Sequence, residues 1–520
     1  MRLSWSPAHA WVGAVLTGGL AALAFSPWAA QAYAGLPAVL MALSVAGWVA
    51  CLNAVRRVSD AALCGGIHGT VWLIGGTGWM YVSLHQFGGL PGWMAALAVG
   101  LLCALLSIFL ALVAASWVHW RRGQWCLDGV LLAALWLMAE WARGTVFTGF
   151  PWAASAYALV DSPFAVFAPW LGVYGTGAVL VMLIAWWVLA LPTPRGRVLA
   201  SVPLMVVALV AGWIQAQGGN QFTSDHGQPL TVSLVQTNVP QNEKFDAAHM
   251  VRQLSWLQEA LLSSQAQLTM APETAIPLLP SQLPEGYWSQ LTRHFSAPGR
   301  AALLGVPLGS YEAGYTNSVA GLSAHGRDAP DGFYRYNKHH LVPFGEFIPL
   351  GFHWFVAMMN IPLGDFTRGP RNAPSFVVAD QRIAPTICYE DLFGEELADR
   401  FVSDGPDHSP TVLANVSNLA WFGKAVAIHQ HLQIARFRSL EFQRPTIRST
   451  NTGSTVVIDH LGRVSAMLPT NSQGVLRATV QGRAGVTPFA AWVGRYGLWP
   501  MVLFAALTIG FLRRRGESRP

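Results

Sequence analysis

Long, uninterrupted apolar runs occupy most of the first 216 residues, and one more lies near the C-terminal end of the chain. A helix needs roughly 20 residues to cross the hydrocarbon of a bilayer, and most of the runs approach or exceed that length. The pattern therefore predicts eight transmembrane helices, at about residues 10–29, 33–52, 62–83, 91–119, 126–142, 164–192, 197–216 and 495–512.

Between the seventh and eighth runs, short β-rich segments alternate with helical ones, which indicates a layered α/β domain. We therefore expect an α-helical transmembrane domain of seven helices (1–217), an α/β domain (218–493) and an eighth helix with a basic tail (494–520). Within the α/β domain, 316–322 and 332–337 are expected to pair. The other expected strands are 230–236, 268–271, 301–306, 384–388, 411–416 and 455–459, and the expected helices are 247–265, 395–402 and 424–442.

Composition and charge support a membrane location. The chain is 53% hydrophobic and only 11% charged, against roughly 25% charged in a typical soluble protein. Short loops rich in arginine stay on the cytoplasmic side, which predicts cytoplasmic termini and a 218–493 domain on the opposite, periplasmic face of a bacterial inner membrane. The net charge of +6 is then partly a topology signal, and we expect no nucleic-acid partner. The arginines that alternate in this way are Arg2, Arg56, Arg57, Arg121, Arg122, Arg195, Arg197, Arg513, Arg514, Arg515 and Arg519.

The first apolar run has a second interpretation. Arg2, the apolar stretch and the small residues up to Ala32 are also typical of a cleaved signal peptide. Because the run is long and another span follows at once, we expect it to be retained. Cleavage would leave the orientation of the other helices unchanged.

Cys388 is the single cysteine of the 218–493 segment, since the other four lie in or beside apolar runs. The domain therefore forms no internal disulfide. A lone cysteine in an oxidising compartment is a liability unless it is buried or used. Cys388 is accordingly a candidate nucleophile.

Two further candidates share its position, because Glu273, Lys338 and Cys388 each lie at or just beyond the end of a predicted strand. Active sites of layered α/β folds gather at such ends. A thiol needs a base or a nearby cation to react at neutral pH. Glu273 would take the proton, and Lys338 with the amide N–H of Tyr389 would stabilise an oxyanion. Taken singly, the three could equally be a surface ion pair, a solvated strand end and a core thiol.

Other ionisable residues give weaker signals. His339 and His340 are adjacent, and His429 and His431 are two residues apart, whereas zinc sites need three or four ligands. We expect no metal and no cofactor. Glu140 and Arg143, at the end of the fifth run, are either functional or a simple i,i+3 pair at the interface.

Several long phrases resemble those of one family. Glu, Lys and Cys in this order, each closing a strand, resemble the nitrilase superfamily, with its αββα sandwich and acyl-thioenzyme chemistry. The whole chain resembles more closely the apolipoprotein N-acyltransferase family, the membrane-embedded branch. The supporting phrases are FTGFPW (147–152), APETAIP (271–277), YNKHHLVPFGEFIP (336–349), ICYED (387–391), NVSNLAWFG (415–423) and HQHLQIARFRSLEFQRPTIRSTNTG (429–453).

The resemblance implies roles for residues at matching positions. Glu273 would be the general base, Lys338 the oxyanion stabiliser and Cys388 the nucleophile, supported by Glu346, Tyr389 and Glu390. Cys388 would take an acyl chain from the sn-1 ester of a phospholipid as a thioester and pass it to the α-amino group of a diacylglyceryl-cysteine on an apolipoprotein. Two departures from the family, Leu419 and Phe245, put local substrate contacts in question.

Three further expectations concern an apolar segment, the rival functions and the oligomeric state. Residues 350–364 are apolar but short for a span, and are either a mobile lid that dips into lipid or a buried core helix. The rival functions are a membrane-anchored nitrilase-like amidohydrolase, which would pass the acyl group to water, and a non-catalytic transporter or lipid-binding scaffold. We expect the protein to be a monomer among membrane lipids.

Overall fold

The computed structural model describes residues 7–219, 221–244, 246–328, 331–356, 366–403, 408–424 and 426–514. It divides the chain into two compact units. A helical unit comprises 1–81, 91–220 and 496–520, and a sheet unit comprises 82–90 and 221–495. The sheet unit is therefore continuous in sequence apart from the short segment 82–90.

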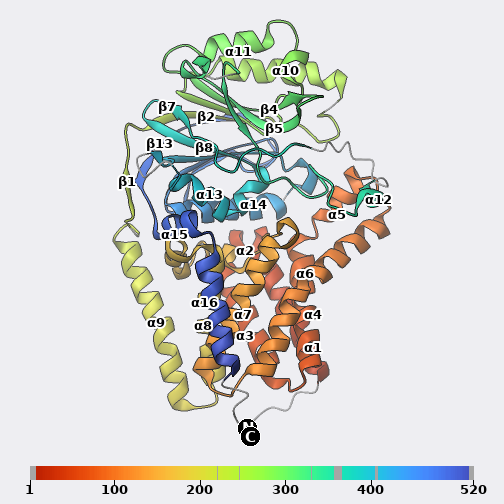
Figure 1. Ribbon diagram of the computed structural model, residues 1–520, viewed down its shortest axis with the longest axis vertical. Coiled ribbons are helices and arrows are strands. Elements are labelled where there is room, and N and C mark those ends of the chain that lie inside the picture. The colour runs from red at the N-terminus through yellow and green to blue at the C-terminus, as the bar shows by residue number, and fades with distance from the viewer. Residues whose placement is uncertain are drawn as a thin grey trace. The chain divides into compact units, whose positions relative to one another are not determined.

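The helical unit is built from long apolar helices (Figure 1). Within the described ranges, five are long and apolar enough to cross a membrane, and a bent pair would make a sixth. The predicted number of eight is not reached by this criterion. The apolar part of α1 is short, and α4 contains His68 and several glycines, which lower its hydropathy. The main helices are α1 (Pro7–Ala24), α3 (Leu36–Ala54), α4 (Val58–Thr77), α6 (Gly92–Trp120), α7 (Trp125–Thr145), α8 (Ala168–Ala190), α9 (Pro194–Ala216) and α16 (Trp499–Arg514).

The last apolar run is not one straight helix. Helix α15 (Pro488–Tyr496) ends before Gly497, and α16 begins at Trp499 with a bend of 86° between the two. Gly497 has a φ of +59°, a conformation in which glycine commonly ends helices. Pro500 then lies in the first turn of α16, where its missing N–H costs no helical hydrogen bond. Because this break is local, hydropathy alone did not predict it.

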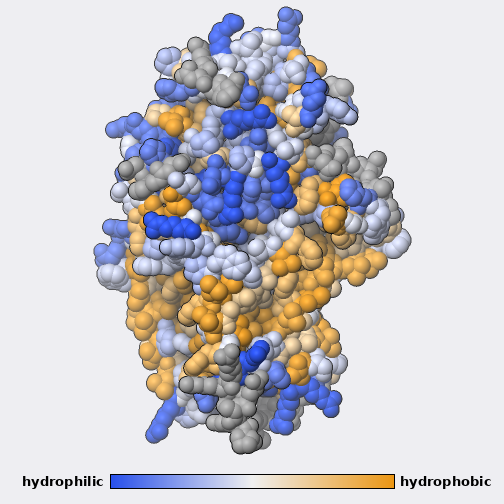
Figure 2. Space-filling model, in the orientation of Figure 1, coloured by the Kyte–Doolittle hydropathy of each residue, from blue (hydrophilic) through white to orange (hydrophobic). Residues whose placement is uncertain are grey.

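The surface of the helical unit is apolar over α6, α9 and α16, and Figure 2 shows hydrophobic side chains across this unit on the face in view. Large apolar side chains on these helices are more than a third exposed, which is expected where lipid rather than water is the solvent. They include Leu97, Leu101, Leu105, Leu112, Leu199, Leu209, Trp213, Leu503, Phe504 and Leu507.

The sheet unit contains two six-stranded sheets. The order of the first is β13-β2-β3-β4-β5-β6 and that of the second is β12-β11-β10-β9-β8-β7. Strands β2, β3 and β4 are parallel in the first sheet, and β8, β9 and β10 are parallel in the second. The parallel strands are β2 (Leu230–Gln236), β3 (Leu268–Ala271), β4 (Ala301–Ser310), β8 (Gln381–Ile387), β9 (Val412–Ser417) and β10 (Thr446–Thr450). The others are β5 (Gly314–Leu322), β6 (Tyr334–Asn337), β7 (Phe376–Val378), β11 (Val456–Ile458), β12 (Val464–Met467) and β13 (Gly474–Val480).

Four layers make up this unit. Alternate residues of the strands, such as Leu268 and Ile383, pack between the two sheets. The opposite face of the first sheet packs against α10 (Ala247–Leu262) and α11 (Tyr287–Phe295). On the second sheet, Ala435 of α14 (Val426–Phe442) packs against β11. This αββα arrangement is the sandwich that was expected, and Figure 1 shows α10 and α11 covering one sheet.

All eight predicted strands are present, six of them with shifted ends. The pairing of 316–322 with 332–337 is confirmed as the antiparallel contact of β5 with β6. Cys388 was predicted to close a strand, but β8 ends at Ile387 and Cys388 begins the 3₁₀ helix Cys388–Leu392. The predicted helix 395–402 is a short α-helix, Gly394–Ala398, followed by a 3₁₀ turn. Strand β10 was not predicted, because its sequence TIRST contains a single aliphatic residue.

Candidate active site

The three residues predicted at strand ends lie at corresponding edges of the two sheets. Glu273 follows β3 by two residues, Lys338 follows β6 directly and Cys388 follows β8 directly. Strand β5 is antiparallel to both β4 and β6, so β6 runs in the same direction as β3 and β4. The topology therefore places Glu273 and Lys338 at one edge of the first sheet.

Lys338 lies between two carboxylates. Its Nζ is 2.9 Å from both oxygens of Glu346 and 3.6 Å from Oε1 of Glu273, and its side chain is 1% exposed. Asn317 of β5 joins the two acids, because its Nδ2 donates to Glu273 at 2.8 Å and to Glu346 at 2.6 Å. Sequence reasoning missed Asn317, which lies inside a strand without any distinguishing motif.

The electrostatics of this cluster keep the lysine charged and the thiol neutral. Burial by itself would lower the pKa of Lys338, but Glu346 and Glu273 outweigh it and raise that pKa above its ordinary value. Burial, together with the negative charge of Glu273, raises the pKa of Cys388, while Lys338 acts in the opposite direction. Cys388 is therefore a neutral thiol at rest, and a thiol needs a base to become reactive.

Cys388 lies on a tight turn and is 8% exposed. Its φ of +52° is unusual for a residue with a side chain. Glu390 fixes this turn, because it accepts the N–H of Ile387 at 2.7 Å and the hydroxyl of Tyr336 at 2.7 Å. Its other oxygen accepts the N–H of His339 at 2.7 Å. Glu390 thus connects the turn at Cys388 to the segment that follows Lys338.

The remaining predicted supporting residues also lie in this region. Tyr389 follows Cys388 and packs its ring against His340 and Phe393. Glu346 holds its own loop, since it accepts the N–H of Val342 at 2.8 Å. The N–H of Asn418 donates to Oε2 of Glu273 at 2.8 Å, and the backbone of Asn418 also acts to lower the pKa of Cys388. Asn418 therefore acts on both Glu273 and the thiol of Cys388, and sequence reasoning did not assign it a role.

Close backbone packing explains how Glu273 reaches this position. A side chain at Gly305 of β4 would place its Cβ 2.0 Å from the carbonyl oxygen of Pro272 and 2.7 Å from Cα of Glu273. Gly369 has the same relation to Asn337, at 2.1 Å from its carbonyl oxygen, directly before Lys338. Glycine is therefore required at both positions for the chain to pass so close.

Lys244 is a second buried lysine that sequence reasoning did not select. It is 5% exposed, and its Nζ donates to the backbone carbonyl of Glu273 at 3.3 Å. Burial lowers its pKa to about 8, while the negative charge of Glu273, and that of Cys388 when it is ionised, act in the opposite direction. Lys244 is therefore mostly a cation at neutral pH. The sequence signal that could have identified it was its position in the segment that follows the carboxyl end of β2.

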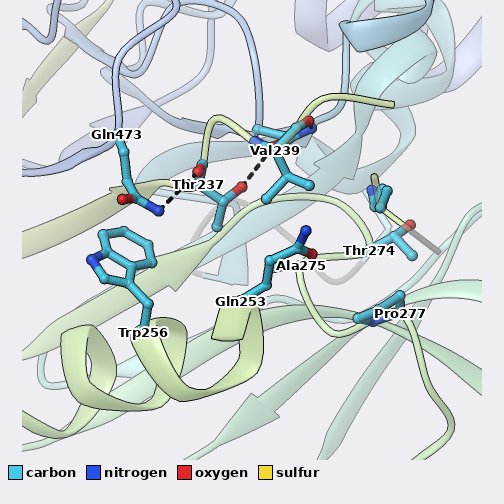
Figure 3. A pocket seen from close by; sticks show the side chains of 10 residues that line it. Thr237, Val239, Gln253, Trp256, Thr274, Ala275, Pro277 and Gln473 are labelled. Carbon is cyan, nitrogen blue, oxygen red and sulfur yellow. Dashed lines mark hydrogen bonds between the residues drawn. The ribbon is translucent and has the colours of Figure 1, made fainter. Parts of the chain in front are cut away.

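A small cavity adjoins this lysine. Figure 3 shows Gln473 donating to the backbone of Thr237 on one side, with Trp256 and Gln253 of α10 on another. Thr274, the residue after Glu273, lines it as well. The full lining is Thr237, Val239, Lys244, Gln253, Trp256, Thr274, Ala275, Pro277, Asn451 and Gln473.

The other candidates have mixed outcomes. Leu419 is 1% exposed and belongs to the hydrophobic core between the sheets, so its side chain contributes to packing. Phe245 and residues 357–364 of the apolar segment 350–364 lie outside the described residues. In the described part of that segment, Leu350 is 98% and Trp354 63% exposed. Among the residues that the structure describes, no group of three His, Cys, Asp or Glu is arranged to hold a metal ion.

Comparison with known proteins gives matches along most of the chain. Residues 17–187 match the model of the apolipoprotein N-acyltransferase N-terminal domain, and residues 231–489 match that of the carbon-nitrogen hydrolases. An apolipoprotein N-acyltransferase of Verminephrobacter eiseniae is 44% identical over 88% of both chains. One of Ralstonia nicotianae is 42% identical over 92% of this chain and 90% of its own. Among solved structures, a carbon-nitrogen hydrolase of Helicobacter pylori is 15% identical, with a TM-score of 0.33 over 53% of this chain and 94% of its own.

Proposed function

The chain belongs to the apolipoprotein N-acyltransferase family, and from this premise we propose how its catalytic domain carries out the reaction. It is an acyltransferase that moves a fatty acyl chain from a phospholipid to the α-amino group of the N-terminal diacylglyceryl-cysteine of apolipoproteins. The observation that carries the proposed mechanism is Lys338 held between Glu273 and Glu346 beside a buried thiol.

In the first step, Glu273 takes the proton of Cys388 and the sulfur attacks the carbonyl carbon of the sn-1 ester. Lys338 and the amide N–H of Tyr389 stabilise the resulting oxyanion. Collapse breaks the bond to the glycerol oxygen, which takes the proton from Glu273 and leaves as a lysophospholipid. The acyl chain remains on Cys388 as a thioester, and splitting one difficult reaction in this way lowers each barrier.

In the second step, the α-amino group of the lipoprotein attacks the thioester. Glu273 accepts the proton that the amine loses, and the sulfur leaves, stabilised by Lys338, before it regains its proton. Glu346 neutralises and orients Lys338, and Glu390 and Tyr389 maintain the turn of the nucleophile. Burial supports this assignment, because a desolvated lysine between two acids cannot rotate away.

We also propose the domain organisation and orientation. Eight spans would place the domain 218–493 at the periplasmic face of the inner membrane and both termini in the cytoplasm. The alternation of arginine-rich loops supports this orientation. Both substrates are lipid-anchored, so the catalytic domain must act close to the bilayer surface.

The test uses the full chain in vesicles that contain radiolabelled phospholipid. We expect label on Cys388 that hydroxylamine releases, and its transfer to a diacylglyceryl peptide supplied afterwards. Cys388→Ala should give no adduct while its thermal unfolding stays that of the wild type. Label that passes only to water would favour the amidohydrolase, and a folded wild-type protein without any adduct would exclude both enzymes.

A further inference from the structure

The backbone carbonyl of Cys388 is held from the interior of the domain. Its oxygen lies 3.1 Å from Nε2 of His431 on α14 and 3.4 Å from Nδ2 of Asn415 on β9. His431 is 1% exposed and Asn415 is fully buried. These contacts involve the backbone of the nucleophile and are distinct from those around Glu273 and Lys338.

The tautomer of His431 follows from its second contact. Nδ1 lies 2.9 Å from Nη2 of Arg448 on β10, and a guanidinium can only donate. Nδ1 therefore accepts, the proton is on Nε2, and Nε2 donates to the carbonyl of Cys388. Arg448 is held in turn by Asp391, which also accepts the hydroxyl of Thr386 at 3.1 Å. Burial, together with the charge of Arg448, lowers the pKa of His431 well below its ordinary value, so the ring stays neutral.

Fixing this carbonyl has a consequence for the next residue. The C=O of Cys388 and the N–H of Tyr389 belong to one planar, trans peptide group, in which they point in opposite directions. A carbonyl directed at His431 and Asn415 therefore directs the N–H of Tyr389 the other way. That N–H is the backbone donor in the proposed oxyanion site, where a small rotation of the peptide would misalign it.

We propose that His431 is a positioning residue for the acyl transfer: its Nε2–H fixes the peptide between Cys388 and Tyr389 and thereby aims the amide that stabilises the oxyanion. Arg448 and Asp391 act through it by enforcing the tautomer. The inference rests on the proposed function, since it takes Cys388 as the nucleophile and the Tyr389 amide as an oxyanion donor. His431 itself touches no reacting atom.

The test compares two amides at position 431. Glutamine places an N–H near the position of Nε2, whereas asparagine reaches only the position of Nδ1. We expect His431→Asn to slow formation of the Cys388 thioester by roughly tenfold to a hundredfold, as small misplacements in active sites do. His431→Gln should stay within about threefold of wild type, which corresponds to less than 1 kcal/mol. His429→Asn, two residues earlier on the same helix and partly exposed, is the matched control and should be unaffected.

A second measurement separates positioning from simple damage. Alkylation of Cys388 by iodoacetamide forms no oxyanion. Mass spectrometry of the peptide that contains Cys388 measures the rate of this alkylation. Its rate should stay within about threefold of wild type in both variants, because it does not use the donors that oxyanion stabilisation needs.

Two results would overturn the inference. One is thioester formation at the wild-type rate in His431→Asn. The other is an equal loss of thioester formation, alkylation rate and thermal stability in His431→Asn and His431→Gln. That result would make His431 a packing residue. Failure of the proposed function would look different, since Cys388→Ala would then retain acyl transfer.

Discussion

Two groups of buried charges, one in each unit, use their charge differently. In the helical unit, Glu140 and Arg143 are 3% and 7% exposed and approach each other only to 4.0 Å. Arg143 donates to the carbonyl of Trp152 at 2.6 Å, and Glu140 accepts the N–H of Ser155 at 2.7 Å. Their main partners are thus backbone groups of the FTGFPW phrase and the residues just after it.

In the sheet unit, Lys338 lies directly between two carboxylates, and Asn317 joins both. The partners here are side chains that gain or lose protons. A buried charge satisfied by backbone groups holds a loop in place, whereas charges that balance one another can move a proton between them. Burial of an ionisable residue is therefore weak evidence for catalysis unless its partners are examined.

The largest expected difference comes from removing the cation of each group. Lys338→Met leaves two adjacent carboxylates without compensation and removes an oxyanion donor, so thioester formation should fall by roughly 10³-fold or more. Arg143→Met leaves the carbonyls of Phe150 and Trp152 without this donor, at a cost of about 1–3 kcal/mol each in stability. Thioester formed per folded molecule should change by less than about fivefold, or 1 kcal/mol, in this variant. Single-turnover labelling and thermal unfolding measure the two effects.

The comparison would break if Arg143→Met, while still folded, lost acyl transfer as completely as Lys338→Met. The helical pair would then belong to the catalytic machinery rather than to the scaffold.

A smaller effect is expected when a carboxylate is neutralised without changing its shape. Glu346→Gln removes one of the two negative charges beside Lys338 and places an amide where a carboxylate accepts the N–H of Val342. Thioester formation should therefore fall by about 10²-fold. Glu140→Gln loses part of its contact with Ser155, which should reduce stability by about 1–3 kcal/mol with little change in turnover. Equal losses of turnover in both variants would contradict the distinction between the two groups.

How much of the fold and of the candidate site could be predicted from the sequence depends on where each residue lies. Runs of alternating aliphatic residues, as in β3 and β4, predicted the sheets, and parallel strands end at one edge, which is why Glu273, Lys338 and Cys388 could be selected together. The polar strand β10 and the break at Gly497 have no such periodicity. The apolar length predicted eight spans, but α4 owes its lower hydropathy to small residues and a histidine.

The missed site residues share a different cause. Asn317 lies inside a strand, Asn418 acts through its backbone, and His431 is one of two histidines on a helix whose pattern does not distinguish them. Each becomes significant only through a partner that is distant in sequence, as Cys388 is from His431, at a separation of 43 positions. Local patterns locate the groups that we propose react, whereas the residues that would orient them depend on the tertiary fold.

The smallest effect expected is that of Lys244→Met. The pKa of Lys244 is about 8 in the folded protein against an ordinary value of 10.5, so the folded chain binds fewer protons than the unfolded one between these pH values. Wild-type stability should therefore rise with pH relative to the variant across that window. At pH 7 the buried cation is a cost, and Lys244→Met should be more stable by about 1–3 kcal/mol.

The titration of Lys244 should also affect the rate of thioester formation at Cys388. While Lys244 is charged it favours the thiolate of Cys388, so wild type should form the thioester about tenfold faster than Lys244→Met at pH 7, equivalent to 1.4 kcal/mol. That ratio should shrink as pH rises through about 8 and the cation is lost. Lys424→Met, at an exposed lysine of the same unit, should change neither quantity. A ratio that stays constant from pH 7 to pH 9.5 would mean that the charge of Lys244 does not act on the thiol, and Lys338 alone would then supply the cation of the site.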